Sequence, residues 1–315
     1  MPGMNNSAMK IIGLTNCPLA SQIVLAFCDL DGAGLKALGM LVPKAGYRAH
    51  SQEIGLSVCG QDLAPSPCYT LQAEENPMSP LASYLTLINI CPDDQPDQPK
   101  VTLIAFNTWL PHHQQSLVAA AFMEAISTSQ DRGVQSATSA PPACLFVLAS
   151  ALIKSAKDSS GVFYTQVGCP DLTAVIGSRE VHSNTNYLDE SHLSLLPAST
   201  QLQDHMLASL HHTASCIGTS AAFVLTPGHR PAAGTIPETE SSEGARKLCR
   251  ALMELAEASS KGQLGYASEA TPSSHLAAWL EVVEARGQRV QLKNPWFWQG
   301  HSNDKNMLLC EGMYC

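Results

Sequence analysis

The chain lacks several features that mark common classes of protein. Among its 315 residues, Lys and Arg number 18 against 27 Asp and Glu, the formal net charge is −9, and no run of basic residues occurs. An acidic chain without a basic patch is a poor ligand for nucleic acids and for anionic membranes. No uninterrupted apolar run reaches the roughly 18 residues of a transmembrane helix. We therefore expect neither nucleic-acid nor membrane binding, whereas a basic protein surface remains a compatible partner.

Paired cysteine motifs are also absent. The 11 cysteines include no C-x-x-C pair, and a secreted disulfide scaffold would be shorter and denser in cysteine. Several cysteines lie inside apolar runs, as in Cys144-Leu145-Phe146-Val147-Leu148, which is typical of buried reduced thiols. We expect reduced cysteines that bind no metal, and a reducing compartment. The cytoplasm fits, and a nuclear or endoplasmic-reticulum-associated protein is also compatible.

The apolar content predicts a folded chain, because 45% of the residues are hydrophobic and only 14% are charged. The clearest unit is a buried strand over Val101–Phe106 followed, after Pro111, by a helical pattern to about Ile126. The continuous apolar run Cys144–Ala149 is typical of a strand in the middle of a parallel sheet. Such alternation predicts an α/β fold with a three-layer, mainly parallel sheet covered by helices on both faces.

The remaining elements follow from hydrophobic periodicity and from turn residues. Toward the N-terminus we expect a strand at 10–14, a helix from Ala20 to Phe27, a turn at 29–34, and strands at 38–42, 54–58, 68–72 and 84–90. Toward the C-terminus we expect a helix at 202–218, a strand at 221–226, and helices at 243–258 and 273–285. One α/β domain is expected over residues 10–258, with a C-terminal extension over 259–315.

No catalytic constellation can be assembled from residue spacing. Asp31-Gly32-Ala33-Gly34 is expected to follow a helix, so we interpret it as a turn and not as a phosphate-binding loop. The adjacent histidines of His112-His113 and His211-His212 point apart on a helix. His212 and Cys216 lie four residues apart and can meet, but two ligands are too few for zinc. We expect no catalytic residue, no cofactor and no metal.

The chain closes on Met313-Tyr314-Cys315, a hydrophobic residue, a tyrosine and one further residue. A tyrosine ring can fill an apolar slot while the terminal carboxylate binds a cation or backbone amides, which is a recurring mode of peptide recognition. A frayed terminus is the plain alternative. Upstream, Trp296-Phe297-Trp298 is interpreted as an anchor of this segment on the domain, with an exposed interaction patch as the alternative.

The order of these parts resembles the proteasome assembly chaperone 1 family. The likeness runs through Lys10–Phe27, Val101–Ile126 and Cys144–Ala149, a final helix, and the hydrophobic-Tyr-any ending. It is strongest over 200–227, where Leu202-Gln203-Asp204-His205 opens a helix that precedes an apolar strand. Residues 154–200 and 259–312 have no counterpart that aligns.

The resemblance implies a non-enzymatic chaperone for assembly of the core (20S) proteasome α-ring, without a cofactor. Such a chaperone acts as a heterodimer with a second proteasome assembly chaperone. By the same resemblance, Met313, Tyr314 and Cys315 would insert into a pocket of the proteasome α subunits. A tethered tail adds a second contact at high effective concentration.

The alternative is a phosphorylase- or hydrolase-like α/β enzyme with its site at the C-terminal edge of the sheet. The loops 107–111 and 227–229 would supply this site, with Asn107, His112 and His229 as candidate residues. A cleft with two or more converging titratable groups at these strand ends favours the enzyme. A flat apolar face beside a loose C-terminus favours the chaperone.

Overall fold

The computed structural model describes most of the chain up to residue 262 and two short segments beyond it. The described residues are 9–12, 14, 17–29, 32–58, 61–63, 65, 67–71, 83–134, 144–153, 161–168, 193–197, 200–228, 240–262, 276–283 and 290–292. None of the helices in these ranges has the length and apolar character required to cross a membrane.

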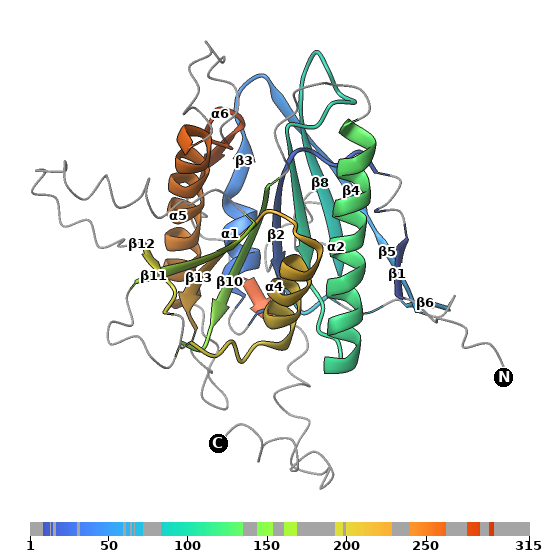
Figure 1. Cartoon of the computed structure of the whole chain (residues 1–315). Coiled ribbons are helices and arrows are strands. Elements are labelled where there is room, and N and C mark those ends of the chain that lie inside the picture. The colour runs from blue at the N-terminus through green and yellow to red at the C-terminus, as the bar shows by residue number, and fades with distance from the viewer. Residues whose placement is uncertain are drawn as a thin grey trace, which may run out of the picture.

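An eight-stranded sheet forms the middle of the molecule, with the order β12-β11-β13-β10-β2-β9-β8-β4. Its central strands β13, β10, β2 and β9 are parallel (Figure 1). Antiparallel strands β11 on one side and β8 and β4 on the other extend it, and β12 pairs in parallel with β11. The bounds are β2 Gln22–Phe27, β4 Tyr47–Glu53, β8 Leu85–Pro92, β9 Val101–Phe106, β10 Cys144–Ala151, β11 Val162–Val167, β12 Leu193–Leu195 and β13 Ala221–Pro227.

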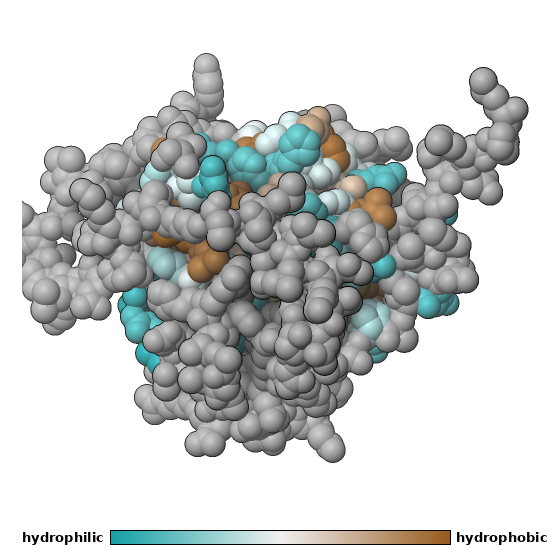
Figure 2. All heavy atoms as spheres, turned by 90° about the horizontal axis from the view of Figure 1, so that it is seen from below, coloured by the Kyte–Doolittle hydropathy of each residue, from teal (hydrophilic) through white to brown (hydrophobic). Residues whose placement is uncertain are grey.

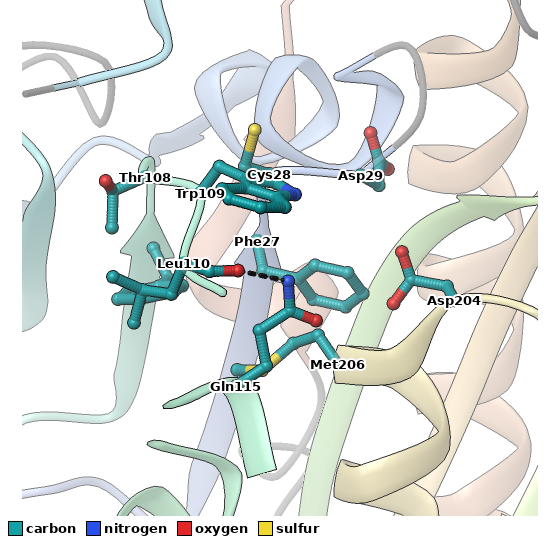
Figure 3. Close-up of a pocket in the computed structure, with 10 residues that line it drawn as sticks. Phe27, Cys28, Asp29, Thr108, Trp109, Leu110, Gln115, Asp204 and Met206 are labelled. Carbon is teal, nitrogen blue, oxygen red and sulfur yellow. Dashed lines mark hydrogen bonds between the residues drawn. The ribbon is translucent and has the colours of Figure 1, made fainter. Parts of the chain in front are cut away.

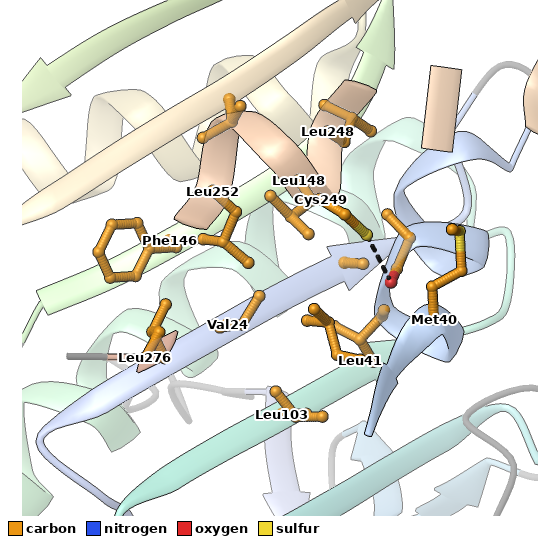
Figure 4. Close-up of a cluster of buried hydrophobic side chains, with 14 of the residues drawn as sticks. Val24, Met40, Leu41, Leu103, Phe146, Leu148, Leu248, Cys249, Leu252 and Leu276 are labelled. Atoms are coloured by element: carbon orange, nitrogen blue, oxygen red, sulfur yellow. Dashed lines mark hydrogen bonds between the residues drawn. The ribbon is translucent and has the colours of Figure 1, made fainter. Parts of the chain in front are cut away.

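Helices cover both faces of this sheet, which confirms the three-layer α/β prediction. Helices α2 (His112–Val134) and α4 (His205–Ile217) lie on one face, and α1 (Ala33–Met40) and α5 (Glu240–Gly262) lie on the other (Figure 1). Strand β2 contributes Val24 to the α1–α5 core and Leu25 to the α2–α4 core. In Figure 4, Val24, Phe146 and Leu148 of the strands face Leu248, Cys249 and Leu252 of α5. Each large side chain buried in this way contributes about 1.5–3 kcal/mol to stability.

Two expectations near the N-terminus are wrong. Residues 22–27 form strand β2 and not a helix, and α1 occupies most of the expected strand at 38–42, of which only the end becomes β3 (Leu41–Pro43). The apolar residues of β2 happen to fall at helical spacing, yet Ile23 through Phe27 are all at most 1% exposed. A strand buried on both faces shows no alternation, so periodicity cannot separate it from a buried helix.

Several expected elements are confirmed in the smaller sheets and in α2. The expected strands β1 (Met9–Ile12) and β5 (Gly55–Val58) form a three-stranded sheet with β6 (Gln61–Leu63), which was not expected. Helix α2 begins after Pro111 as expected but continues to Val134. The buried face of α2 centres on Val118 and Phe122, whereas Leu117 is 41% exposed. The Phe122 ring packs edge-on against Phe106 at 5.8 Å between centroids.

The expected helix at 273–285 is also wrong, because α6 (Leu276–Trp279) ends at Trp279 and the next residues form strand β14 (Leu280–Val282). Strand β14 pairs with β3, and Leu276 and Trp279 are buried in the α1–α5 core. Strand β15 (Val290–Leu292) pairs with β7 (Tyr69–Leu71). Segments beyond residue 258 therefore pack on the α/β fold, while the division of the chain into a domain and an extension stays a prediction.

Candidate functional site

Polar side chains gather where the parallel strands end. In an open α/β sheet the carboxyl ends of parallel strands form the usual ligand-binding edge. The segments after β2 and β9 meet here, beside the first turns of α2 and α4. Figure 2 views the molecule from below, the side to which the arrow of β10 points in Figure 1, and small separate areas of hydrophilic and hydrophobic residues are visible there.

The segment after β2 carries a buried carboxylate. Asp29 is 3% exposed, and its Oδ2 accepts hydrogen bonds from the backbone N–H of Gly34 at 3.0 Å and of Ser150 at 2.6 Å. The Gly32–Gly34 turn thus follows a strand and opens helix α1, so the expectation that it follows a helix is wrong. A β–loop–α unit of this type often holds a phosphate at the helix N-terminus. Here the carboxylate of Asp29 holds the N–H of Gly34 instead.

The segment after β9 is held by backbone and side-chain hydrogen bonds. Asn107 is fully buried, and its N–H donates to the carbonyl of Tyr84 at 2.8 Å. The Gln115 amide of α2 donates to the Leu110 carbonyl at 2.6 Å. These bonds fix the path of residues 107–111 between β9 and α2, and Trp109 of this segment lines the pocket at the ends of the strands.

A second carboxylate caps helix α4. Asp204 is the N-cap residue, and its Oδ1 accepts from the N–H of Leu207 at 2.8 Å. Burial raises the pKa of Asp204, and the backbone N–H groups of Leu207 and Met206 and the charge of His205 act in the opposite direction. Its capping role is the one that Asp commonly plays at helix starts.

A serine and a histidine meet between α2 and α4. Ser116 Oγ lies 2.8 Å from His205 Nε2 and 3.1 Å from Ser209 Oγ. The rings of His112 and His205 are 5.2 Å apart and nearly perpendicular. Partial desolvation of the ring, and secondarily the charge of His205, lower the pKa of His112. A serine hydroxyl bonded to a histidine is the geometry of a nucleophile with its base, but this hydroxyl also reaches Ser209 and joins the two helices.

These segments enclose a cavity of about 80 Å³. Figure 3 shows the Phe27 ring between Gln115 and Asp204, with Trp109 and Cys28 on the neighbouring wall. The lining residues are Phe27, Cys28, Asp29, Phe106, Thr108, Trp109, Leu110, Gln115, Asp204 and Met206. A pocket with titratable groups at the strand ends is the feature expected for an enzyme, but backbone N–H groups occupy an oxygen of each carboxylate.

Of the residues singled out from the sequence, some lie outside the described ranges, and the structure places Asn107 and His112. Met313-Tyr314-Cys315 and His229 lie outside the described residues, as does Trp296-Phe297-Trp298. Asn107 is buried in the chain's own hydrogen bonds, and His112 is exposed at the start of α2.

Two further expectations concern histidines and metal ligands. His212 Nε2 and Cys216 Sγ do meet, at 3.6 Å on the exposed face of α4. Within the described ranges, no three His, Cys, Asp or Glu side chains gather as metal ligands, and the absence of a bound metal stays a prediction.

Sequence reasoning missed the polar residues that the fold brings together. Asp204 lies inside the helix expected over 202–218, whereas α4 begins only at His205 and Asp204 is its N-cap residue; an Asp near the start of a helical pattern is an N-cap signal that would have moved the expected start. Asp29 was hidden because the run before it was interpreted as a helix. Ser116 and His205 carry no local signal, because they meet only through the packing of α2 on α4.

Comparisons with known proteins place the chain among distant structural neighbours. No protein-family model matches it, and no curated protein matches it either. It is similar to an archaeal proteasome activator from Pyrococcus furiosus, with 11% identity, 79% of this chain and 89% of that chain covered, and a TM-score of 0.47. It is also similar to a Pyrococcus furiosus homologue of proteasome-assembly chaperone, with 12% identity, 82% of this chain and 88% of that chain covered, and a TM-score of 0.44. A third similar structure is purine nucleoside phosphorylase from Toxoplasma gondii, with 9% identity, 78% of this chain and 93% of that chain covered, and a TM-score of 0.35. All three TM-scores are below 0.5.

Proposed function

We propose that this chain is a non-enzymatic chaperone for assembly of the core proteasome α-ring. It would act as a heterodimer with a second assembly chaperone and dock Met313-Tyr314-Cys315 into an α-subunit pocket. The observation that carries the proposal is the unit formed by residues 202–226, where the resemblance to assembly chaperones is strongest. This stretch folds as α4 and β13, capped by Asp204 and closed by Gly218, and β13 lies directly beside β10 in the parallel centre of the sheet.

The use of the polar groups at the strand ends supports a role without catalysis. Asp29 binds the backbone N–H groups of Gly34 and Ser150, and Asp204 binds that of Leu207. Both carboxylates thus hold the starts of helices and the end of a strand in place. Many α/β enzymes carry their active site at this edge, but here both carboxylates bind backbone N–H groups of the chain itself. An α/β fold alone does not imply catalysis.

The tail would act by its own chemistry. A buried tyrosine ring contributes about 2 kcal/mol, and a hydrogen bond to the terminal carboxylate about 1.5–3 kcal/mol. Loss of the ring should therefore weaken binding about 30-fold, since 1.4 kcal/mol corresponds to a factor of 10. Adding residues after Cys315 removes the carboxylate and should weaken binding by a similar factor.

Binding to isolated proteasome α subunits tests the proposal. The wild-type chain, Tyr314→Ala and a form extended after Cys315 are compared, with Leu309→Ala as a matched change outside the tripeptide and an equal extension at the N-terminus as the second control. We expect Tyr314→Ala and the form extended after Cys315 to bind the α subunits about 30-fold more weakly and to keep the complex with the partner chaperone. Equal binding by all five proteins would make the tail a bystander, and a wild-type chain that binds no α subunit would end the proposal.

A phosphorylase- or hydrolase-like activity is the second candidate, favoured by the pocket that Asp204 lines. It predicts turnover of nucleosides with inorganic phosphate, or of simple esters, that Asp204→Asn abolishes. Absence of turnover with both substrate classes, together with α-subunit binding, would leave the chaperone role alone.

A further inference from the structure

The cavity at the ends of β2 and β9 combines aromatic rings with acidic groups. Its aromatic side chains are Phe27, Phe106 and Trp109, and its carboxyl groups belong to Asp29 and Asp204. Among the described residues that line it, there is no Lys, Arg or His. The face of an aromatic ring carries negative charge density and attracts cations. Rings and carboxylates therefore favour the same kind of ligand, one with a positive charge.

The acidic groups lie together on one side of the cavity. Figure 3 shows Asp29 and Asp204 on one side of the Trp109 ring and Leu110 on the other. The Phe27 ring lies next to Asp204 in the same view. A ligand with a charge at one end and an apolar chain at the other matches this division.

Burial separates the rim of the cavity from its floor. Trp109 and Asp204 are partly exposed, whereas Phe27 and Phe106 are at most 2% exposed. The two buried rings therefore form the floor, and Trp109 and Asp204 belong to the rim. The cavity measures about 80 Å³. Because one water needs about 10–15 Å³, an unbranched chain of about five heavy atoms fits.

Backbone N–H groups favour the ionised form of both carboxyl groups. Oδ2 of Asp29 accepts from the N–H of Gly34 and of Ser150, and Oδ1 of Asp204 accepts from the N–H of Leu207. These donors are neutral dipoles, so the hydrogen bonds leave the negative charge in place. Burial raises the pKa of Asp204, because the anion loses hydration. A cation beside this carboxylate would offset that cost.

We propose that the cavity binds a primary alkylammonium group, R–NH3+. Its methylene chain packs against Phe27 and Trp109, and its ammonium donates hydrogen bonds on the side of Asp204 and Asp29. Hydrogen bonds between charged groups are about twice as strong as neutral ones. A free amine and a lysine side chain of another protein present the same chain and charge. The site is separate from the tail at 313–315, so it does not rest on the proposed function.

Binding of n-butylammonium chloride to the full chain tests the site without any proteasome component. Saturation-transfer NMR titrations give the Kd. The matched neutral ligand is 1-butanol, which has the same carbon chain with –OH in place of –NH3+. We expect millimolar binding of n-butylammonium and at least about tenfold weaker binding of 1-butanol. Equal affinities, or no binding of n-butylammonium, would overturn the proposal.

Asp204→Asn removes one charge and keeps the helix cap, because Asn and Asp are about equally good N-cap residues. We expect it to weaken n-butylammonium binding at least about tenfold. Asp94→Asn is the matched control for nonspecific attraction to a chain of net charge −9.

Asp94 is exposed in the turn before β9, at the other end of that strand from the cavity. Its distance, about 20 Å along the strand, exceeds the Debye length of about 8 Å at physiological ionic strength. We therefore expect Asp94→Asn to change the Kd by less than about twofold. Equal effects of Asp204→Asn and Asp94→Asn would show nonspecific attraction and overturn the proposal.

Trp109→Leu tests the aromatic wall. We expect it to weaken n-butylammonium binding about threefold or more, because the cation loses the face of the indole ring. An unchanged Kd would place the ammonium outside this cavity and overturn the assignment. Circular dichroism checks that each variant is folded. If a variant does not fold, the comparison of n-butylammonium with 1-butanol on the wild-type chain decides the site.

A capped Gly-Lys-Gly peptide distinguishes the two sources of the ammonium group. Binding of both this peptide and n-butylammonium would assign the site to lysine side chains, and binding of n-butylammonium alone would assign it to free amines. The same peptide acetylated on the lysine nitrogen is the control, because it keeps the chain and loses the charge. If the acetylated peptide binds as tightly as the unmodified one, the cavity does not recognise the ammonium group and the proposal is wrong.

Discussion

Helix α1 approaches strand β10 very closely at Gly34, and replacing this residue should be costly. A Cβ at Gly34 would lie 2.2 Å from the carbonyl oxygen of Leu148 and 2.9 Å from its carbonyl carbon. Both are backbone atoms of β10 and cannot rotate aside. In Gly34→Ala, helix α1 must therefore move away from the strand, which also stretches the 3.0 Å hydrogen bond from the Gly34 N–H to Asp29.

The expected loss follows from three contributions. Overpacking of a filled core costs about 1–3 kcal/mol, and a weakened hydrogen bond to a carboxylate costs up to about 1.5–3 kcal/mol. Alanine returns about 1 kcal/mol because it favours the helix over glycine. We expect Gly34→Ala to lower the free energy of unfolding by about 1.5–5 kcal/mol in total.

Gly244→Ala is the matched control, since Gly244 also lies in a helix against the sheet. Its nearest neighbour is the Thr226 side chain, at 3.3 Å from an added Cβ. Because that neighbour can adjust, we expect a change within about 1 kcal/mol. Urea unfolding followed by circular dichroism measures both variants. If Gly34→Ala is as stable as Gly244→Ala, α1 does not approach β10 as closely as this reasoning requires.

Three further perturbations test the packing and the electrostatics. Phe122→Ala should cost about 3–5 kcal/mol in urea unfolding because Phe122 is fully buried, and Leu117→Ala on the exposed side of α2 should stay within about 0.5 kcal/mol; equal losses would contradict the orientation of α2. The pKa of His112 is lower in the folded protein than in the unfolded chain. As pH falls below about 6.5, the unfolded chain therefore takes up a proton at His112 before the folded protein does, and this destabilises the fold. The urea midpoint of His112→Gln should thus fall less than that of the wild type on acidification, and parallel pH profiles would refute this. Trp279→Ala should cost about 3–5 kcal/mol in a single transition, because Trp279 is 7% exposed in the α1–α5 core; a neutral effect would detach α6 from that core.

Part of the candidate site carried a sequence signal, and part carried none. The strand Val101–Phe106 places the loop with Asn107 at a sheet edge by its local pattern. Asp204 carries the N-cap signal of an Asp near a helix start, although the expected helix at 202–218 began before it. The contact between Asp29 and Ser150 carries no such signal, because it depends on β2 lying beside β10. The cavity likewise depends on the meeting of the segments after β2 and β9 with α2 and α4, which are distant in the sequence.

The sequence by itself determined the class of the fold and those elements whose signals are local. Helix α4 combines an Asp cap, apolar residues at helical spacing and Gly218 at φ 75°, a backbone conformation that glycine adopts without strain. Only the tertiary structure decided that residues 22–27 are a strand, that α6 ends after one turn, and which polar groups meet at the sheet edge. Burial on both faces removes the alternation that identifies a strand, and contacts between distant residues arise only when strand order and helix packing bring them together.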